Sequence, residues 1–322
     1  MKKIIGTIAT TAILATSILA LDVPANHMVD TAWIKANMND KDLVIIDIRK
    51  KSCDKKELVK GAVCWKKTNH RESRYYSKKT KKGIPGYIAA PITIKRALQK
   101  SGVNNDSAIV FYAGGTKAKD YRDGALGALT LEYYGFENVA ILDGGFAGWK
   151  KDGGEISKKP AKNKKGNFDF KGRKFNQNVI ATGEDIDEAV YTGNYQTVDT
   201  NGKQEKTRNE AKGSHWYGTA KDPRRMKEGH LPNAKAMHTS KLSVQKDGVW
   251  YLGDKTHVLA EFKKAGIDST KPIIWYCNTG NLISGTWFAA KYVVGMKDVN
   301  NRAYNGSMAD YTAWPKRKLL KK

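Results

Sequence analysis

The chain has 322 residues, of which 40% are hydrophobic, and this is enough for two domains of ordinary size. Lysine and arginine number 57 against 32 acidic residues, which gives a formal net charge of +25. The basic residues are scattered without a motif that would place a helix or an aromatic sheet against bases, so we expect no nucleic acid partner. The charge fits a solvated basic surface or a small anionic substrate. The composition excludes a collagen, a coiled coil and a wholly disordered chain.

The N-terminus has the pattern of a secretory signal peptide. Lys2 and Lys3 precede an uncharged, largely apolar run that ends at Leu21. We expect residues 1–21 to act as the signal, with cleavage after Ala20 or after Ala25 as the two options. An uncleaved anchor is the alternative, because a run of this length is near the lower limit for a membrane span. After cleavage we expect a periplasmic or secreted protein that has no membrane partner.

The chain contains three cysteines, Cys53, Cys64 and Cys277. In an oxidising compartment an odd number leaves at least one thiol free. Cys53 and Cys64 are close in sequence and are able to form a disulfide. The alternative is that both are small buried or idle residues, and the spacing does not decide between the two.

The chain divides into two similar halves around a lysine-rich stretch, residues 157–166, which has the composition of a surface linker. The same order of landmarks on either side indicates an internal repeat. In the first half we predict helix 30–37, strands 43–48 and 61–65, helix 93–101, strand 108–112 and a closing glycine turn at 143–149. In the second half we predict helix 183–190, strands 195–199 and 233–237, helix 257–265, strand 272–276 and a closing turn at 305–311.

Short apolar strands that alternate with helices predict a parallel sheet with helices on both faces. The predicted fold class is therefore α/β, with two tandem domains of the same kind. We expect the first domain at residues 28–155, a linker at 156–177 and the second domain at 178–316.

The most informative segment surrounds Cys277. The predicted strand stops at this cysteine, and a short loop of small and polar residues leads into a helix. Such a loop aims backbone N–H groups and the positive end of the helix dipole at one point. A thiol at that point favours its thiolate, and the loop is able to hold an anion against it. Taken alone, the segment is more typical of a buried structural cysteine at a strand end.

The features together resemble the rhodanese family. The resemblance rests on the repeat, on the strand–cysteine loop–helix unit, on the EGHLPNA motif at 228–234, and on the closing motifs LDGGFAGWK at 142–150 and YNGS at 304–307. It covers about residues 28–155 and 178–316. Asn233 stands where the family pattern has a glycine.

The resemblance implies sulfur transfer. In this family the loop cysteine attacks the outer sulfur of a donor, becomes a persulfide and passes that sulfur to an acceptor, which is covalent catalysis by a cysteine nucleophile. Cys277 matches the nucleophile. The loop residues implied to hold the persulfide and the anionic donor are Asn278, Thr279, Gly280, Asn281 and Leu282. The hydroxyls of Thr279 and Ser284 are either further donors or caps of the helix start.

The first half departs from the active pattern, because Ala113 stands at the position of the nucleophile. No thiol at that position means no persulfide. The resemblance therefore implies an inactive first domain that helps to wall the active-site cleft. Neither Cys53 nor Cys64 lies on the corresponding loop.

The expected substrates are a small anionic sulfur donor, such as thiosulfate, a polysulfide or a mercapto-acid, and cyanide or a thiol as acceptor. Because Asn278 and Thr279 are neutral, the charge of the donor has to be met elsewhere. Arg224 and Arg225 are the nearest basic group in sequence, and arginine binds carboxylates and sulfonates bidentately. The alternative is that these arginines are plain surface charge, because an insertion at 201–221 obscures the comparison with the family.

Two other functional classes compete with sulfur transfer. Related phosphatases use a Cys-x5-Arg loop, but the residue six after Cys277 is Ile283 and the next arginine is Arg302. A non-catalytic sulfur-binding or partner-binding protein on the same scaffold is the alternative to an enzyme. We expect no metal or organic cofactor, because no Cys/His spacing suits zinc and no strand precedes a G-x-G-x-x-G loop. A free thiolate is open to oxidation, which makes a reducing protein a further candidate partner.

Overall fold

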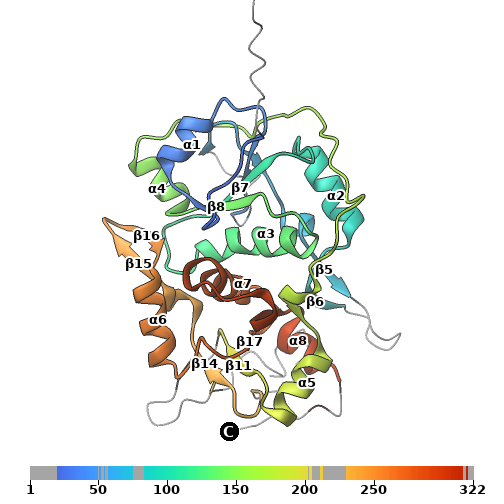
Figure 1. Cartoon of the computed structure of the whole chain (residues 1–322). Coiled ribbons are helices and arrows are strands. Elements are labelled where there is room, and N and C mark those ends of the chain that lie inside the picture. Colours follow the sequence, from blue (N-terminus) through green and yellow to red (C-terminus); the bar gives the residue numbers. More distant parts are fainter. Residues whose placement is uncertain are drawn as a thin grey trace, which may run out of the picture.

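The computed structural model describes residues 20–49, 51, 54, 57–74, 83–201, 203–204, 211–212, 230–314 and 317 (Figure 1). Nearly all of the predicted signal peptide, Cys53, and the pair Arg224 and Arg225 lie outside these residues. Within the described ranges, no helix is both long and apolar enough to cross a membrane.

The described chain contains two five-stranded sheets with the same strand order, and neighbouring strands in both run parallel. The first sheet runs β1 (Met28–Val29), β8 (Val139–Leu142), β7 (Ala108–Tyr112), β2 (Leu43–Asp47) and β4 (Val63–Cys64). The second runs β10 (Ile180–Ala181), β18 (Asn301–Tyr304), β17 (Ile273–Tyr276), β11 (Gln196–Asp199) and β14 (Lys235–Ala236). This confirms the prediction of two tandem parallel α/β units.

The helices are likewise repeated. The first unit has α1 (Thr31–Asn37), α2 (Pro91–Lys100), α3 (Tyr121–Tyr133) and α4 (Gly145–Lys151). The second has α5 (Gly183–Thr192), α6 (Lys255–Lys264), α7 (Ile283–Phe288) and α8 (Ser307–Tyr311), and α7 continues as a π-helical turn, η5 (Ala289–Val294). Side chains cap several of these starts, since Asp30 accepts a hydrogen bond from the Trp33 amide and Thr182 forms a capping box with Asp185.

Helices cover both faces of each sheet. Alternate residues of a strand point to opposite faces, so an apolar strand contributes side chains to the packing on each side. On β2, Ile45 packs in a cluster with Ile34 of α1 and Trp149 of α4. Ile46 faces the other way and packs in the cluster that contains Leu98 of α2 and Leu129 of α3. The near-continuous apolar strands of the sequence reflect this two-sided burial.

The two units pack against each other through α3 and α7, which lie side by side at the centre of the molecule (Figure 1). One hydrophobic cluster continues from the first sheet through these helices to the second sheet. The Tyr121 hydroxyl donates to the Thr239 carbonyl oxygen at 3.1 Å, and Lys291 forms an ion pair with the buried Glu132. The interface is therefore part of the core of the protein.

Two β-hairpins that the sequence analysis did not predict cross this interface in opposite directions. The first hairpin is β5 (Arg71–Arg74) and β6 (Ile84–Ile88), and the second is β15 (Ser243–Lys246) and β16 (Val249–Leu252). Strand β6 packs against α8 of the second unit, while β16 packs against α4 of the first (Figure 1). Each unit thus covers the closing turn of the other.

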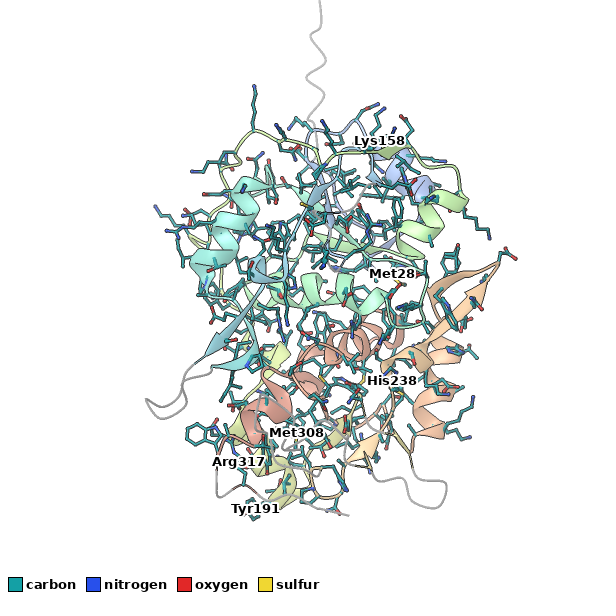
Figure 2. All side chains as sticks on the ribbon, turned by 180° about the vertical axis from the view of Figure 1, so that it is seen from behind. Met28, Lys158, Tyr191, His238, Met308 and Arg317 are labelled. Atoms are coloured by element: carbon teal, nitrogen blue, oxygen red, sulfur yellow. The ribbon has the colours of Figure 1, made fainter. Side chains whose placement is uncertain are left out.

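The predicted linker at 156–177 is attached to the first unit along much of its length. Strand β9 (Ile156–Ser157) pairs with β3 (Leu58–Val59), and Phe168 is fully buried against the ring of Phe136. The lysines of this stretch face solvent while Phe168 lies in the core of the first unit, so the segment is fixed to that unit and is not a free linker. At the opposite end, Arg317 returns to α5 and pairs with Asp187 at 3.0 Å (Figure 2).

Candidate active site

Cys277 lies directly after β17, at the carboxyl end of a central strand of the second sheet. In open parallel sheets ligands bind at this edge. Its side chain is free and only 2% exposed. The backbone amide of Gly280 donates a hydrogen bond to the Cys277 sulfur at 3.1 Å, across a loop in which Gly280 has a φ of +72°. The left-handed conformation of Gly280 turns this N–H toward the sulfur.

Ser307 contacts the same cysteine from the closing turn after β18. Its hydroxyl oxygen accepts a hydrogen bond from the Cys277 amide at 3.2 Å and lies 3.9 Å from the sulfur. Ser307 has a φ of +50°, which is uncommon for a residue other than glycine. The strained backbone and the two contacts mark Ser307 as part of the site.

Arg71 of strand β5 reaches the loop from the first unit. Its Nη2 atom donates to the carbonyl oxygen of Gly280 at 2.9 Å and to that of Thr279 at 3.2 Å. The side chain is buried, and burial lowers the pKa of Arg71 to about 10, while the nearby charge of Cys277 opposes the shift. The carbonyl groups of the loop therefore point to Arg71 while the Gly280 amide points to the sulfur.

Three glycines allow these segments to approach each other. A Cβ atom at Gly86 of β6 would lie 2.0 Å from the Thr279 carbonyl oxygen, and one at Gly280 would lie 2.8 Å from Arg71 Nη2. A Cβ at Gly306 would lie 2.8 Å from the ring of Tyr87. The site is thus assembled from a loop, a turn and a hairpin that belong to two different domains.

The predicted loop residues occupy several environments. The Asn278 carbonyl accepts from the Ala309 amide at 2.9 Å, and its side chain accepts from Asn201, so it joins the loop to α8 and to the segment that follows β11. The Asn281 side chain donates to the Thr279 hydroxyl at 3.4 Å, and Leu282 is the residue before α7. The structure brings these residues around Cys277, while Arg224 and Arg225 lie outside the described part of the chain.

The hydroxyl of Ser284 lies within hydrogen-bond distance of the carbonyl oxygens of Asn281 (2.8 Å) and Arg122 (2.9 Å). Both partners are acceptors, so the Ser284 hydroxyl donates to them and links the start of α7 to the start of α3. His230, whose Nδ1 atom lies 2.9 Å from the Leu231 carbonyl oxygen, has a local structural contact.

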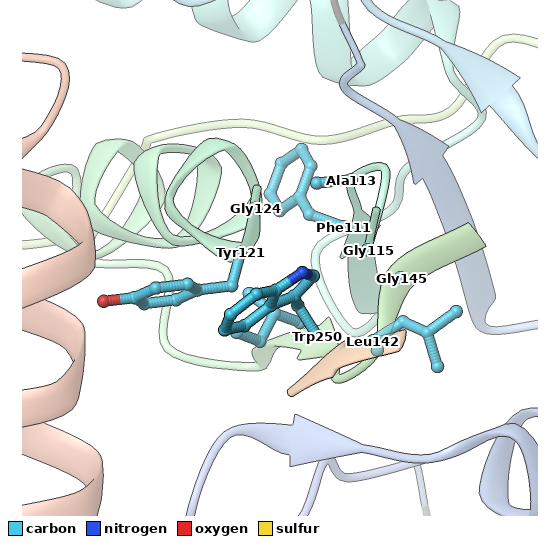
Figure 3. Close-up of a pocket in the computed structure, with 10 residues that line it drawn as sticks. Phe111, Ala113, Gly115, Tyr121, Gly124, Leu142, Gly145 and Trp250 are labelled. Atoms are coloured by element: carbon cyan, nitrogen blue, oxygen red, sulfur yellow. The ribbon is translucent and has the colours of Figure 1, made fainter. Parts of the chain in front are cut away.

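The corresponding place in the first unit is a small pocket around Ala113 (Figure 3). Trp250 of β16 lines it beside Gly115, and the Trp250 amide donates to the Gly115 carbonyl oxygen at 2.9 Å. A Cβ at Gly144 would lie 2.5 Å from the ring of Tyr251, as Gly306 meets Tyr87 in the second unit. The loop that carries Ala113 is therefore held by the same kind of turn and hairpin contacts as the Cys277 loop. Trp250 lines the space beside it.

Arg71 and Ser307 were not among the predicted site residues. Ser307 had a detectable signal, because the closing turn reads Asp143-Gly144-Gly145 in the first half and Asn305-Gly306-Ser307 in the half that carries the cysteine. Arg71 had no such signal in the sequence. The residue reaches the Cys277 loop only because its hairpin packs on the other domain.

Cys64, on β4, is disulfide-bonded, whereas Cys277 has a free thiol. Its predicted partner, Cys53, lies outside the described residues. The disulfide reserves Cys64 for a structural role and leaves Cys277 as the nucleophile candidate.

Comparison with known proteins places these features in a family. Residues 30–152 match the model of the rhodanese-like domain. A protein named "Putative thiosulfate sulfurtransferase" from Saccharopolyspora erythraea is 25% identical over 67% of this chain and 71% of its own length. The fold is similar to that of SseA from Escherichia coli, described among 3-mercaptopyruvate sulfotransferases (TM-score 0.66, 22% identity, 87% of this chain and 98% of that one). It is also similar to that of Tum1 from Saccharomyces cerevisiae (TM-score 0.68, 18% identity, 93% and 99%). Residues 30–152 of this chain therefore belong to the rhodanese-like family.

Proposed function

We propose that this protein is a sulfurtransferase that carries sulfane sulfur as a persulfide on Cys277. The observation that carries the proposal is the position of the free thiol, at the end of a central parallel strand with the Gly280 amide 3.1 Å from its sulfur. The sulfurtransferase names of the distant relatives support the same reaction class.

The proposed reaction has two half-reactions at one atom. The Cys277 thiolate attacks the outer sulfur of the donor, a Cys–S–S⁻ persulfide forms, and the bond to the rest of the donor breaks, releasing sulfite from thiosulfate or pyruvate from 3-mercaptopyruvate. Cyanide or a thiol then attacks the outer sulfur of the persulfide and leaves with it, which restores the Cys277 thiolate. The Gly280 amide is in place to stabilise negative charge on sulfur in both steps.

The direct test is cyanide-dependent thiocyanate release from thiosulfate and, separately, from 3-mercaptopyruvate. We expect turnover by the wild type and none by Cys277→Ser, in which a smaller and much less nucleophilic hydroxyl replaces the thiol. Turnover that persists in Cys277→Ser would exclude this site. A persulfide that forms on the reduced wild-type protein without turnover would instead support a non-catalytic sulfur-binding function.

We also propose export to the periplasm or the cell exterior with removal of the signal. The Cys64 disulfide supports this, because disulfides persist in oxidising compartments. The Asn138 side chain donates to the Leu21 carbonyl oxygen at 2.7 Å and accepts from the Val23 amide at 2.9 Å. Of the two cleavage positions, only the one after Ala20 retains these contacts. The mass of the protein from a periplasmic extract tests this: a chain that begins at Leu21 is expected, and a full-length chain contradicts the proposal.

A further inference from the structure

We propose that Arg71, supplied by the thiol-free first domain, is the cation whose charge attracts and stabilises the sulfur-bearing anion at Cys277 from across the Thr279–Gly280 peptide. The inference deepens the proposed sulfur transfer and rests on it for its biological meaning. It assigns to the first domain a positive charge that acts on a reaction taking place on the second.

The first argument is burial without an anionic partner. The Arg71 side chain is 5% exposed, and its Nε atom is buried with no hydrogen-bond partner. Within the described part of the chain, its side-chain hydrogen bonds go to the Thr279 and Gly280 carbonyl oxygens, and no carboxylate forms an ion pair with it. A buried guanidinium of this kind is strongly unfavourable unless an anion lies beside it. The Cys277 thiolate, its persulfide or a bound donor is the anion available at this place.

The second argument is position. The two carbonyl groups that hold Arg71 belong to Thr279 and Gly280, and the amide of Gly280 donates to the Cys277 sulfur. The guanidinium and the sulfur thus lie on either side of one peptide segment. The pKa of Arg71, lowered to about 10 by burial and raised in turn by Cys277, leaves the side chain protonated at neutral pH.

The third argument is the comparison between the two halves of the molecule. The Ala89 amide donates to the His70 carbonyl oxygen at 3.1 Å, and the Gly253 amide donates to that of Leu242 at 2.8 Å. Because these bonds occupy the same place in the two hairpins, the residues that follow, Arg71 and Ser243, are structural equivalents.

Ser243 makes the corresponding contact across the interface, since its hydroxyl donates to the Ala118 carbonyl oxygen in the first-domain loop at 2.7 Å. In the first domain, the neutral hydroxyl of Ser243 is therefore enough to hold the loop in place. The positive charge occurs over the loop that carries Cys277, and serine occurs over the loop that carries Ala113. This pairing of cation with thiol indicates a role for the charge beyond anchoring.

The test compares the alkylation of Cys277 by anionic iodoacetate and by neutral iodoacetamide, followed on the Cys277 peptide by mass spectrometry. Both reagents consume the same thiolate, so the ratio of their rate constants cancels any change in thiolate population and reports the local charge. We expect the wild-type ratio to exceed that of free cysteine at least tenfold. Arg71→Gln, which keeps amide donors for the loop but removes the charge, should lower the ratio at least tenfold. Arg71→Lys should stay within about threefold of the wild type, and Ser243→Ala, the matched control at the equivalent position, should leave it unchanged.

A wild-type ratio no higher than that of free cysteine would by itself overturn the proposal. An Arg71→Gln ratio equal to that of the wild type would also overturn it. So would an Arg71→Lys ratio as low as that of Arg71→Gln. If the buried sulfur resists both reagents, calorimetric binding of thiosulfate to Cys277→Ala serves as readout. Adding Arg71→Gln should then weaken binding at least tenfold, and unchanged affinity would overturn the proposal. Neither readout requires turnover, so a protein that binds anions through Arg71 but transfers no sulfur would refute only the proposed function.

Discussion

The Ser307 hydroxyl oxygen accepts the hydrogen bond of the Cys277 amide at 3.2 Å and lies 3.9 Å from the Cys277 sulfur. Ser307 has a φ of +50°, where its counterpart in the first domain, Gly145, has one of +55°. In the domain that carries the thiol, a serine thus has the left-handed backbone conformation that glycine has in the other domain.

Ser307→Gly is expected to lower kcat/KM about tenfold, because the hydroxyl that fixes the Cys277 backbone is lost. Its stability should fall by about 1 kcal/mol, since relief of the positive-φ strain offsets part of the loss of two hydrogen bonds, those to the Cys277 amide and the Tyr304 carbonyl oxygen. Ser307→Ala keeps the strain and loses both bonds, so it should be destabilised by about 2 kcal/mol relative to wild type. Thiocyanate release and urea unfolding measure both effects; a fully active Ser307→Gly would contradict the role of the hydroxyl.

Gly86→Ala is expected to detach the first hairpin from the active-site loop. Gly86 has a φ of +100°, and its added Cβ would lie 2.0 Å from the Thr279 carbonyl oxygen, which belongs to backbone and yields little. We expect a loss of at least about 2 kcal/mol of stability and of most activity. Gly248→Ala is the matched control, because Gly248 has a φ of +80° in the other hairpin with nothing within 4 Å of the added Cβ. Equal losses of activity in the two variants would show that strain alone is responsible.

His70 is expected to make the protein less stable in acid. Burial, followed by the charges of Arg71 and Lys67, lowers its pKa from 6.5 to about 3, so the folded protein keeps it neutral while the unfolded chain binds a proton. Stability should therefore fall as pH decreases from 6.5 toward 3, by at most about 1.4 kcal/mol per pH unit from this residue.

His70→Leu, which introduces the residue found at the equivalent position 242, should remove this part of the acid sensitivity. Urea unfolding of both proteins at pH 7, 5.5 and 4.5 measures the difference. Identical dependence of the unfolding free energy on pH in the two proteins would show that His70 does not contribute.

Ala113→Cys in a Cys277→Ala background is expected to restore less than about 1% of wild-type turnover. The first-domain loop would then carry a thiol, but Ser243 stands over it in place of Arg71 and Trp250 lines the space beside it. Cyanide-dependent thiocyanate release measures this, with Cys277→Ala alone as the baseline. Substantial turnover would mean that a thiol on this framework is sufficient without the cation.

The repeat and the fold class were predictable because each rests on local patterns. Apolar strands such as Ala108–Tyr112 and Ile273–Tyr276 were placed to within a residue, since burial on both faces leaves a continuous apolar run. The hairpins were not predicted, because segments such as Ile84–Ile88 contain glycine and proline and become strands only by pairing and by packing on the other domain.

By itself the sequence determined the chemistry of the candidate nucleophile: a single cysteine at a strand–loop junction in one half, and Ala113 at the same place in the other. Local order suffices for this, because the strand, the loop and the cysteine are adjacent along the chain. Only the tertiary structure decided which groups surround that sulfur. Arg71 is more than 200 residues from Gly280 in sequence and meets its carbonyl oxygen at 2.9 Å, because the two domains share one core and exchange hairpins across it.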